Sequence, residues 1–345
     1  MKNIKIGIIG ATGYTGSELV RLLTDHPNAE IKIITSESRA GEKFSDVHPQ
    51  FLNICDDELK SINEISNYDL DIVFLALPHG VSMDFVAKNH HQKFKIIDLS
   101  GDFRLKSKSD YEHWYKMDHH FPKGIEDAVY GLPELFRDRI KDSELVANPG
   151  CFPTASILPI APLVMEGLVE TDHIVIDAKT GVTGAGVKAK EVTHFPNTND
   201  NFKAYGVSNH RHTIEIQEKV GECTSAAVTV LFTPHLLPVD RGIISSAYLK
   251  PRKKVDQELI DKVFADHYGA EPFVRYRKVV PHLKQVRGTN FCDVFAQYDE
   301  RTNTIITMGV IDNLVKGAAG QAIQNMNIIM GLNETTGLRQ VPLQP

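Results

Sequence analysis

Residues 4–16 of the chain read IKIGIIGATGYTG, and this stretch decides the fold. Residues 4–9 form an apolar, β-branched run of strand length, which Gly10 ends. Residues 17–27 read SELVRLLTDHP, in which leucines at helical spacing form an apolar face that Pro27 ends. Residues 31–35 predict a second strand. A strand, a glycine turn, a helix and a second strand predict a right-handed βαβ unit with a parallel sheet.

The same alternation continues through the first part of the chain. Residues 71–76 (DIVFLA) and 95–99 (KIIDL) predict buried strands, and residues 81–90 (VSMDFVAKNH) between them predict a short helix. Continuous apolar strands suit a parallel sheet that is covered on both faces. The sequence up to about residue 149 therefore predicts a doubly wound α/β domain of the Rossmann type.

Beyond residue 150 the apolar pattern changes to longer, more alternating strands, which favour a mixed or antiparallel sheet. Residues 154–167 and 256–269 predict helices, whereas residues 182–202 are the best candidate for a long loop. This second domain is expected to be of α+β character. Its strands are expected at residues 173–181, 226–236, 242–251, 291–300 and 304–312.

The end of the chain predicts a long helix at residues 313–331 with small residues on one face. We expect this helix to return to the first domain, which would then be discontinuous. The expected domains are residues 1–149 with 313–345, which bind a nucleotide, and residues 150–312, which carry the substrate site and the dimerisation surface.

Composition excludes several classes of function. The 345 residues carry a formal net charge of -6, so no basic excess points to nucleic acid. No stretch approaches the ~20 apolar residues that would span a bilayer, and no signal peptide is recognisable. The four cysteines, which are Cys55, Cys151, Cys223 and Cys292, form no disulfide framework and no metal-ligand spacing. A reduced, cytoplasmic protein without a metal is the simplest interpretation.

The glycines after the first strand predict a dinucleotide site. A pyrophosphate must approach backbone N–H groups at a helix N-terminus, where side chains would block it. The alternative is a tight turn without a ligand, but the position between a strand and an amphipathic helix favours binding. The residues expected to contact the cofactor here are Gly10, Thr12, Gly13, Tyr14, Thr15 and Gly16.

The end of the second strand favours NADP(H) over NAD(H). NAD sites prefer an acidic group there, which holds the ribose 2′-hydroxyl. Ser36, Ser38 and Arg39 can instead hold a 2′-phosphate by charge-assisted hydrogen bonds. Glu37 argues the other way unless its side chain points outward. The alternative for Arg39 is that it is a charged, solvent-exposed loop residue that binds no ligand.

Residues 148–154 read NPGCFPT and contain the sharpest local feature of the chain. Pro-Gly predicts a turn, and Pro153 suits a first helical turn, which places Cys151 at a helix start. Helix N-terminal N–H groups stabilise a thiolate and can hold a developing oxyanion. We interpret Cys151 as a nucleophile. The other three cysteines are expected to act as small buried hydrophobes.

The segments GATGYTG, NPGCFPT and SNHRHTIEI together resemble the N-acetyl-gamma-glutamyl-phosphate reductases, enzymes of arginine biosynthesis. The resemblance covers essentially the whole chain, including DLSGDFRL, YGLPEL and DNLVKGAAGQA. The wider semialdehyde dehydrogenase family includes aspartate-semialdehyde dehydrogenase, with similar thiol chemistry. Thr213 stands where this family often has proline after HRH, which is a minor departure.

The resemblance places the HRH segment at the active site. A thiol that attacks an acyl phosphate needs a proton partner, and histidine suits that role near neutral pH. His210 is favoured slightly over His212 as this acid/base, and either one alone could be a structural histidine. Glu215 lies three residues past His212 and could orient it. The pairs at residues 90–91 and 119–120 are interpreted as solvated loop histidines.

The substrate phosphate and carboxylate need cationic partners. Arg104 follows a strand end, where open α/β sheets bind ligands, and the resemblance places it near the phosphate with Ser100 close by. Lys179 and Arg211 are weaker candidates, for which a surface salt bridge is the alternative. The resemblance also places Asn313 and Gly317 near the nicotinamide, although close helix packing explains the small residues equally well.

These features predict an NADPH-dependent reductase of a small acyl phosphate that works through a Cys151 thioester and assembles as a homodimer or homotetramer. One alternative is a sister enzyme for aspartyl phosphate or an aminoadipyl homologue. Physics alone does not fix the substrate chain length, because one methylene is worth only about 1–3 kcal/mol. The other alternative is a non-catalytic NADP-binding regulator, against which the intact Cys151 and HRH segment argue.

Overall fold

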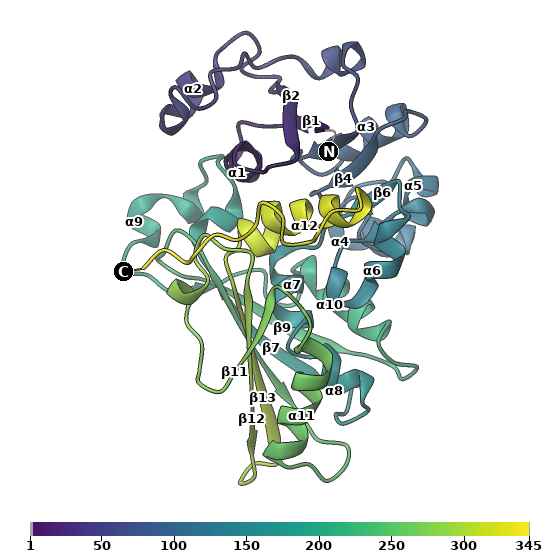
Figure 1. The fold of residues 1–345 in the computed structure, drawn as a ribbon. Helices are drawn as coiled ribbons and strands as arrows, with labels where there is room; N and C mark the ends of the chain where they lie inside the picture. Colours follow the sequence, from purple (N-terminus) through teal and green to yellow (C-terminus); the bar gives the residue numbers. More distant parts are fainter. Residues whose placement is uncertain (1–2, 345) are drawn as a thin grey trace. The chain divides into compact units, whose positions relative to one another are not determined.

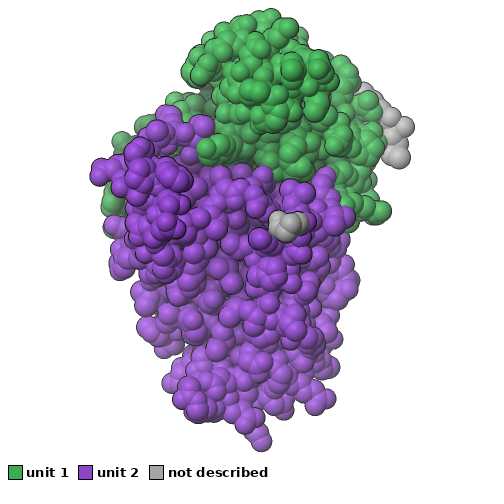
Figure 2. Space-filling model, turned by 90° about the vertical axis from the view of Figure 1, so that its left-hand side faces the viewer, with its two compact units in different colours: residues 1–149, 318–339 green, residues 150–317, 340–345 purple. Residues whose placement is uncertain are grey.

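The computed structural model describes residues 3–344, which form two compact units (Figure 2). Unit 1 consists of residues 1–149 and 318–339, and unit 2 of residues 150–317 and 340–345. This division differs from the expected one at residues 313–317 and at the C-terminal tail, both of which belong to unit 2. Asn313 explains the first difference, because its side-chain amide bonds Gly242 and Thr183 in unit 2.

Unit 1 contains a six-stranded sheet in which every pairing is parallel, in the order β2-β1-β3-β4-β6-β5. The predicted Rossmann-type, doubly wound fold is therefore confirmed (Figure 1). Its strands are β1 Ile4–Ile9, β2 Ala29–Thr35, β3 Ile72–Leu75, β4 Lys95–Asp98, β5 Val129–Tyr130 and β6 Leu145–Ala147. Its helices up to residue 149 are α1 Tyr14–Thr24, α2 Phe44–Val47, α3 Val81–Asn89, α4 Lys108–Tyr115, α5 Pro122–Asp127 and α6 Pro133–Lys141, with short 3₁₀ turns at Pro49–Phe51 and Ile62–Asn67.

Helix α12 (Gly320–Ile329) completes unit 1 from the far end of the sequence and packs against α1, α6 and β4. All but its last residue are buried, including polar ones. The side-chain amide nitrogens of these residues donate hydrogen bonds. The side chains of Gln321 and Asn325 both donate to the carbonyl of Gly131, at 3.0 and 2.9 Å.

Unit 2 is built on a mixed seven-stranded sheet in the order β11-β12-β13-β10-β7-β9-β8, as expected for an α+β domain. The pairs β7–β9 and β11–β12 are parallel, and the others are antiparallel. Its strands are β7 Ile174–Thr180, β8 Lys203–Ala204, β9 Val230–Leu236, β10 Ile243–Leu249, β11 Val274–Arg277, β12 Cys292–Asp299 and β13 Thr304–Ile311. Its helices are α7 Cys151–Ile157, α8 Ala161–Met165, α9 Phe195–Thr198, α10 His212–Gly221 and α11 Gln257–Tyr268.

One face of the unit 2 sheet is buried, and the other is partly exposed. Residues of β7 alternate strictly between buried and half-buried, and those of β9 follow the same period. Helices α7, α10 and α11 contact the sheet, and α8 lies beside α11 (Figure 1). On the exposed face, paired residues form an apolar row across four strands, consisting of Leu231, Val175, Tyr248 and Ile306.

Two local expectations were wrong. The helix expected at residues 154–167 starts earlier, at Cys151, and breaks after Ile157 before a second helix begins at Ala161. Pro159 explains the break, because proline lacks an N–H for the helical ladder. His119 is buried rather than solvated, and its Nε2 lies 2.9 Å from the carbonyl oxygen of Asp102.

A π-helical turn, Val315–Ala319, precedes α12, and the boundary between the two units falls inside it. Within residues 3–344, no helix is both long enough and apolar enough to cross a membrane.

Candidate active site

A cavity of about 250 Å³ in unit 2 gathers the predicted nucleophile and both histidines. Its size suits a small metabolite rather than a polymer. The described residues that line it are Cys151, Phe152, Thr180, Gly184, Ala185, Lys190, Val192, Thr193, Tyr205, His210, Arg211, His212 and Leu236. Sequence segments far apart thus contribute to one pocket within a single unit.

Cys151 is the first residue of α7 and follows Gly150, which is the N-cap in an extended conformation. The carbonyl of Gly150 accepts from the backbone N–H of Thr154 and from its hydroxyl, at 3.0 and 3.2 Å. Gly317 packs directly behind the cysteine: a Cβ at residue 317 would lie 2.8 Å from that of Cys151. Only glycine allows this approach, so Gly317 lies against the Cβ of Cys151, and its position near the nicotinamide stays a prediction.

Glu215 fixes the turn before Cys151. Its side chain is fully buried in the first turn of α10, and its carboxylate accepts the backbone N–H of Gly150 at 2.8 Å. A hydrogen bond to a buried carboxylate is among the stronger ones in proteins. The sequence suggested that Glu215 orients His212. The structure shows that it holds the residue next to Cys151.

The two histidines lie together in an aromatic enclosure. Their ring centroids are 4.8 Å apart, and Phe152 packs edge-on against both, at 5.7 and 5.9 Å. Tyr205 and Phe232 contact His210 at 5.6 and 5.5 Å. These contacts bring both histidines to the residue after Cys151, which was not apparent from their spacing in the sequence.

Burial lowers the pKa of His210 to about 4, and the positive charge of Arg211 adds to the effect. A histidine with this pKa is neutral throughout the physiological range. Its Nδ1 accepts the backbone N–H of His212 at 3.2 Å. In the neutral ring, the proton is therefore assigned to Nε2, which can donate a hydrogen bond.

This arrangement predicts the titration of His210. We expect its ring resonances to show a midpoint near pH 4, so that the ring stays neutral at pH 6, where an ordinary histidine with a pKa of about 6.5 is mostly protonated. The measurement is an NMR pH titration of histidine-labelled protein, with the signal assigned by His210→Gln. Replacing Arg211 by glutamine should raise the midpoint, because a neighbouring positive charge is removed. A midpoint near 6.5 in the wild-type protein would contradict the buried, neutral ring.

Sequence reasoning missed several residues of the cavity, including Thr180, Lys190 and Tyr205. Burial raises the pKa of Tyr205, and the nearby Cys151 adds to the rise, so the phenol keeps its proton. Tyr205 stands three residues beyond the 182–202 loop, in a stretch without regular periodicity. No motif therefore marked it, although the loop itself was recognised.

Two predicted residues have other partners in unit 2. Lys179 is not among the described residues that line the cavity: its Nζ lies 2.6 Å from the carboxylate of Asp177. Neighbouring residues of β7 face opposite sides of the sheet, and Thr180 takes the cavity side. Asn313 accepts the N–H of Gly242 at 2.7 Å and donates to the Thr183 hydroxyl at 2.9 Å, which anchors the 182–202 loop.

In unit 1, the glycine turn has the form that a dinucleotide needs. Gly10 has a φ of +86°, and a Cβ there would lie 2.5 Å from the carbonyl oxygen of Ala76. Gly13 is the N-cap of α1 and supplies no side-chain cap. The N–H groups of the first helical turn, at Tyr14, Thr15 and Gly16, are those a phosphate would use. These residues fit a bound dinucleotide.

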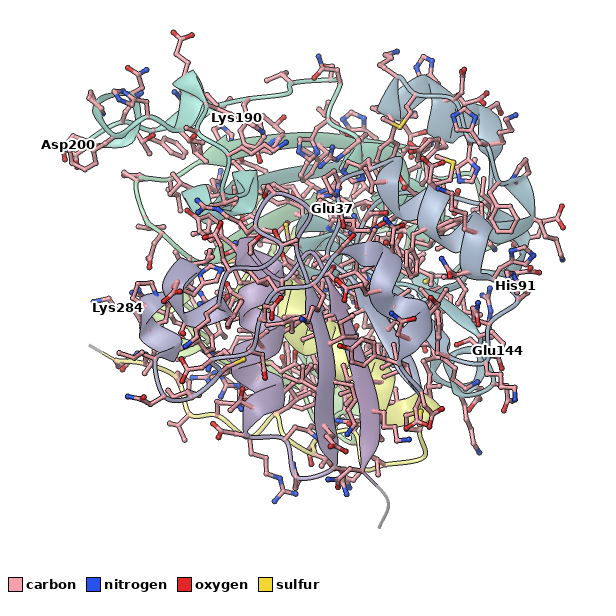
Figure 3. All side chains as sticks on the ribbon, turned by 90° about the horizontal axis from the view of Figure 1, so that it is seen from above. Glu37, His91, Glu144, Lys190, Asp200 and Lys284 are labelled. Carbon is pink, nitrogen blue, oxygen red and sulfur yellow. The ribbon has the colours of Figure 1, made fainter. Side chains whose placement is uncertain are left out.

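The end of β2 also fits the predicted preference for NADP(H) over NAD(H). Ser36 is buried, and its hydroxyl lies 3.1 Å from that of Thr12, whereas Ser38 is exposed. The carboxylate of Glu37 accepts the backbone N–H of Ile62 at 2.6 Å and so caps a neighbouring turn (Figure 3). The guanidinium of Arg39 is exposed and lies 3.1 Å from Glu42.

Ser100 and Arg104 are both buried at the ends of β4 and β6. Arg104 donates to the carbonyl oxygens of Asn148 and Leu99, each at 2.8 Å. Ser100 donates to Asp98 at 2.7 Å, and burial raises the pKa of that carboxyl group to about 6. Both side chains therefore organise the strand ends. Their contact with a substrate phosphate stays a prediction.

Comparison with known proteins identifies the family of both units. Residues 5–143 match the family model described as semialdehyde dehydrogenase, NAD binding domain, and residues 151–313 match semialdehyde dehydrogenase, dimerisation domain. A curated N-acetyl-gamma-glutamyl-phosphate reductase of Desulforudis audaxviator is 48% identical over 97% of this chain and 98% of its own. That of Methanocaldococcus jannaschii is 47% identical over 99% of both chains.

Solved structures of lower identity share the fold. Aspartate semialdehyde dehydrogenase II from Vibrio cholerae, complexed with ASA, superposes with a TM-score of 0.72 at 16% identity, covering 96% of this chain and 99% of its own. The Candida albicans aspartate semialdehyde dehydrogenase with NADP gives 0.70 at 17% identity, covering 95% of this chain and 99% of its own.

Proposed function

Because this chain belongs to the semialdehyde dehydrogenase family, we propose that it reduces N-acetyl-gamma-glutamyl phosphate to N-acetylglutamate semialdehyde with NADPH and releases phosphate, a step of arginine biosynthesis. Relatives that share nearly half of their residues over almost the whole chain carry this activity in their name. The observation that carries the proposal is the meeting of Cys151, Arg211 and both histidines in one cavity.

The first step uses the Cys151 thiolate, which attacks the acyl carbon of the substrate. The carbon–oxygen bond to phosphate breaks, phosphate leaves with the electron pair, and a thioester remains on Sγ. Arg211 lines the cavity and supplies positive charge for the phosphate group. The turn that Glu215 holds keeps Sγ at the start of α7 throughout this step.

The second step reduces the thioester. NADPH, when bound, would supply the hydride that the thioester carbonyl carbon accepts. We propose that a hydrogen bond from the histidine pair stabilises the thiohemiacetal oxyanion that results, with His210 favoured because its neutral ring presents a donor at Nε2. Collapse of this oxyanion breaks the carbon–sulfur bond, releases the aldehyde and returns the thiolate.

The pyrophosphate and 2′-phosphate contacts that we propose lie in unit 1, at the glycine turn and at the end of β2, whereas Asn313 and Gly317 are proposed to lie near the nicotinamide. Gly10, Thr12, Gly13, Tyr14, Thr15 and Gly16 would hold the pyrophosphate, and Ser36, Ser38 and Arg39 the 2′-phosphate. Ionic pairing of Arg39 with the exposed Glu42 is weak and leaves the guanidinium available. Glu37 does not compete, because its carboxylate caps the turn at Ile62.

Self-association is part of the proposal. The family model that matches unit 2 is named for dimerisation, and the exposed sheet face presents the apolar row Leu231, Val175, Tyr248 and Ile306. Such a surface is typical of an interface between subunits. A homodimer or homotetramer in the cytoplasm is the form that we propose.

Leu231→Asp is expected to shift the protein toward the monomer mass of 38.5 kDa, because a charge would be buried in the apolar row. The measurement is light scattering after size exclusion, over a range of concentrations. Leu52→Asp is the matched control, since Leu52 is equally apolar, 62% exposed and located in unit 1. Equal masses for the wild type and Leu231→Asp would place the interface elsewhere.

The decisive experiment runs the reaction in reverse. N-acetylglutamate semialdehyde, phosphate and NADP are supplied, and formation of NADPH is followed, with aspartate semialdehyde and the aminoadipyl homologue as parallel substrates. The proposal requires phosphate-dependent turnover that is fastest with the N-acetylglutamyl substrate. Activity with another semialdehyde alone would keep the mechanism and replace the substrate. Inactivity with every substrate would favour an NADP-binding regulator.

A further inference from the structure

Lys190 is a cation of the cavity to which the mechanism above gives no task. It lies in the 182–202 loop, which forms one wall of the cavity, whereas Cys151 and the histidines come from other elements. Its carbonyl accepts both the N–H and the hydroxyl of Thr193, at 3.0 and 3.2 Å. These bonds fix its backbone at the start of a 3₁₀ turn, Glu191–Thr193. Figure 3 labels Lys190 together with Asp200 of the same loop.

The cavity has an excess of positive charge. Of the described residues that line it, Lys190 and Arg211 are the permanent cations, and none is a carboxylate. The charge of Arg211 acts on His210, so Arg211 serves the reacting end of the substrate. A second cation on a different wall implies a second anionic group on the ligand.

The ammonium group of Lys190 is available to bind such an anionic group. Within the described part of the chain, the one hydrogen bond of its ammonium group is to the carbonyl of Ala185 at 3.5 Å, the limit of a hydrogen bond. Throughout residues 3–344, no carboxylate lies within ion-pair distance of it. The contrast is with Lys179, which pairs with Asp177, and Arg39, which pairs with Glu42.

We propose that Lys190 binds the free α-carboxylate of the substrate and thereby selects amino-acid-derived semialdehydes over uncharged aldehydes of the same length. This inference rests on the proposed function, because it takes the substrate's two anionic ends from it. The phosphate end lies at Cys151 and Arg211, and the carboxylate end lies at the loop. Lys190 is thus a specificity-determining residue that acts on binding rather than on the chemical steps.

The test compares two aldehydes in the reverse assay, N-acetylglutamate semialdehyde and 4-acetamidobutanal, which keeps the acetamide and lacks the carboxylate. In Lys190→Met, kcat/KM for the semialdehyde should fall by about tenfold through KM, and kcat/KM for 4-acetamidobutanal should not change. Lys190→Arg should restore most of the loss. Lys188→Met is the matched control, because Lys188 is an exposed lysine of the same loop outside the cavity lining.

An equal loss for both aldehydes, or a raised KM for phosphate, would overturn the inference and show that Lys190 serves the phosphate or the loop. Wild-type activity with aspartate semialdehyde alone would overturn the proposed substrate instead. The same comparison, made between aspartate semialdehyde and 3-aminopropanal, which keeps the amino group and lacks the carboxylate, would then still test Lys190. A wild type inactive with every aldehyde would end both proposals together.

Discussion

Cys151→Ser is expected to lower turnover by about a thousandfold or more while the affinity for NADP stays the same. A serine hydroxyl is a far weaker nucleophile than a thiolate, and the neutral His210 is a poor base for activating it. The proposed contacts to the phosphate groups of the cofactor all lie in unit 1, whereas Cys151 belongs to unit 2. The measurements are the reverse assay and a fluorescence titration with NADPH. Turnover of the variant at the wild-type rate would refute the covalent route.

Cys223→Ser is the control for this variant, and it should keep full activity. Burial raises the pKa of Cys223 and that of Cys55 to about 11 each, so both remain thiols at neutral pH. Iodoacetamide at pH 7 should therefore label Cys151 first and stop turnover at one modification per chain. Substrate without NADPH should protect the same residue. Rapid labelling of the buried Cys55 or the half-buried Cys223 would contradict their protonated state.

Glu215→Ala is expected to lower kcat by about a hundredfold and the free energy of unfolding by about 2–3 kcal/mol. The change removes the acceptor of the Gly150 N–H in a fully buried position. Gly150 then loses its anchor, and Cys151 loses its fixed place at the start of α7. The measurements are steady-state kinetics and urea unfolding.

Glu215→Gln separates positioning from charge, because an amide oxygen can still accept the same N–H. We expect it to recover most of kcat and most of the stability. Glu258→Ala is the helix control, since Glu258 occupies the first turn of α11 but is exposed. If Glu215→Ala unfolded more easily yet kept the wild-type kcat, its role would be structural only. If glutamine failed as alanine does, the charge rather than the hydrogen bond would be essential.

The sequence predicted those parts of the fold whose signals are local. Strand β1 was placed at its true bounds, because an uninterrupted apolar run has strand length and a glycine ends it. The long strands β10, β12 and β13 were found from their length and their more alternating apolar pattern. Strand β5 has only two residues and β6 has three, too few to show a period. Strand β11 is short and half-buried, so its pattern carried no strand signal.

The candidate site was predicted as far as motifs reach. The sequence NPGC identified the helix start and its cysteine, and HRH identified the histidines that share the cavity with it. The hydrogen-bond partner of each side chain was not predictable, because it depends on which residues are neighbours in the folded structure. Nothing in the spacing of Glu215 tells that it reaches Gly150, 65 residues away in sequence. The sequence likewise showed no sign that Arg104 is buried and donates hydrogen bonds to two backbone carbonyls.

Unit 1 is built from two separate segments of the chain, and the ribosome synthesises these segments at different times. Its sheet and first six helices are synthesised by residue 149, but α12, which packs against α1, α6 and β4, is translated only after all of residues 150–317. At about 5–20 residues per second, the unfinished unit waits ~10–40 s for its last helix. During that time the surface that α12 will cover stays open. Nascent chains stalled between residues 149 and 320 should therefore bind chaperones that recognise apolar surface, and release them once the ribosome has passed the end of α12.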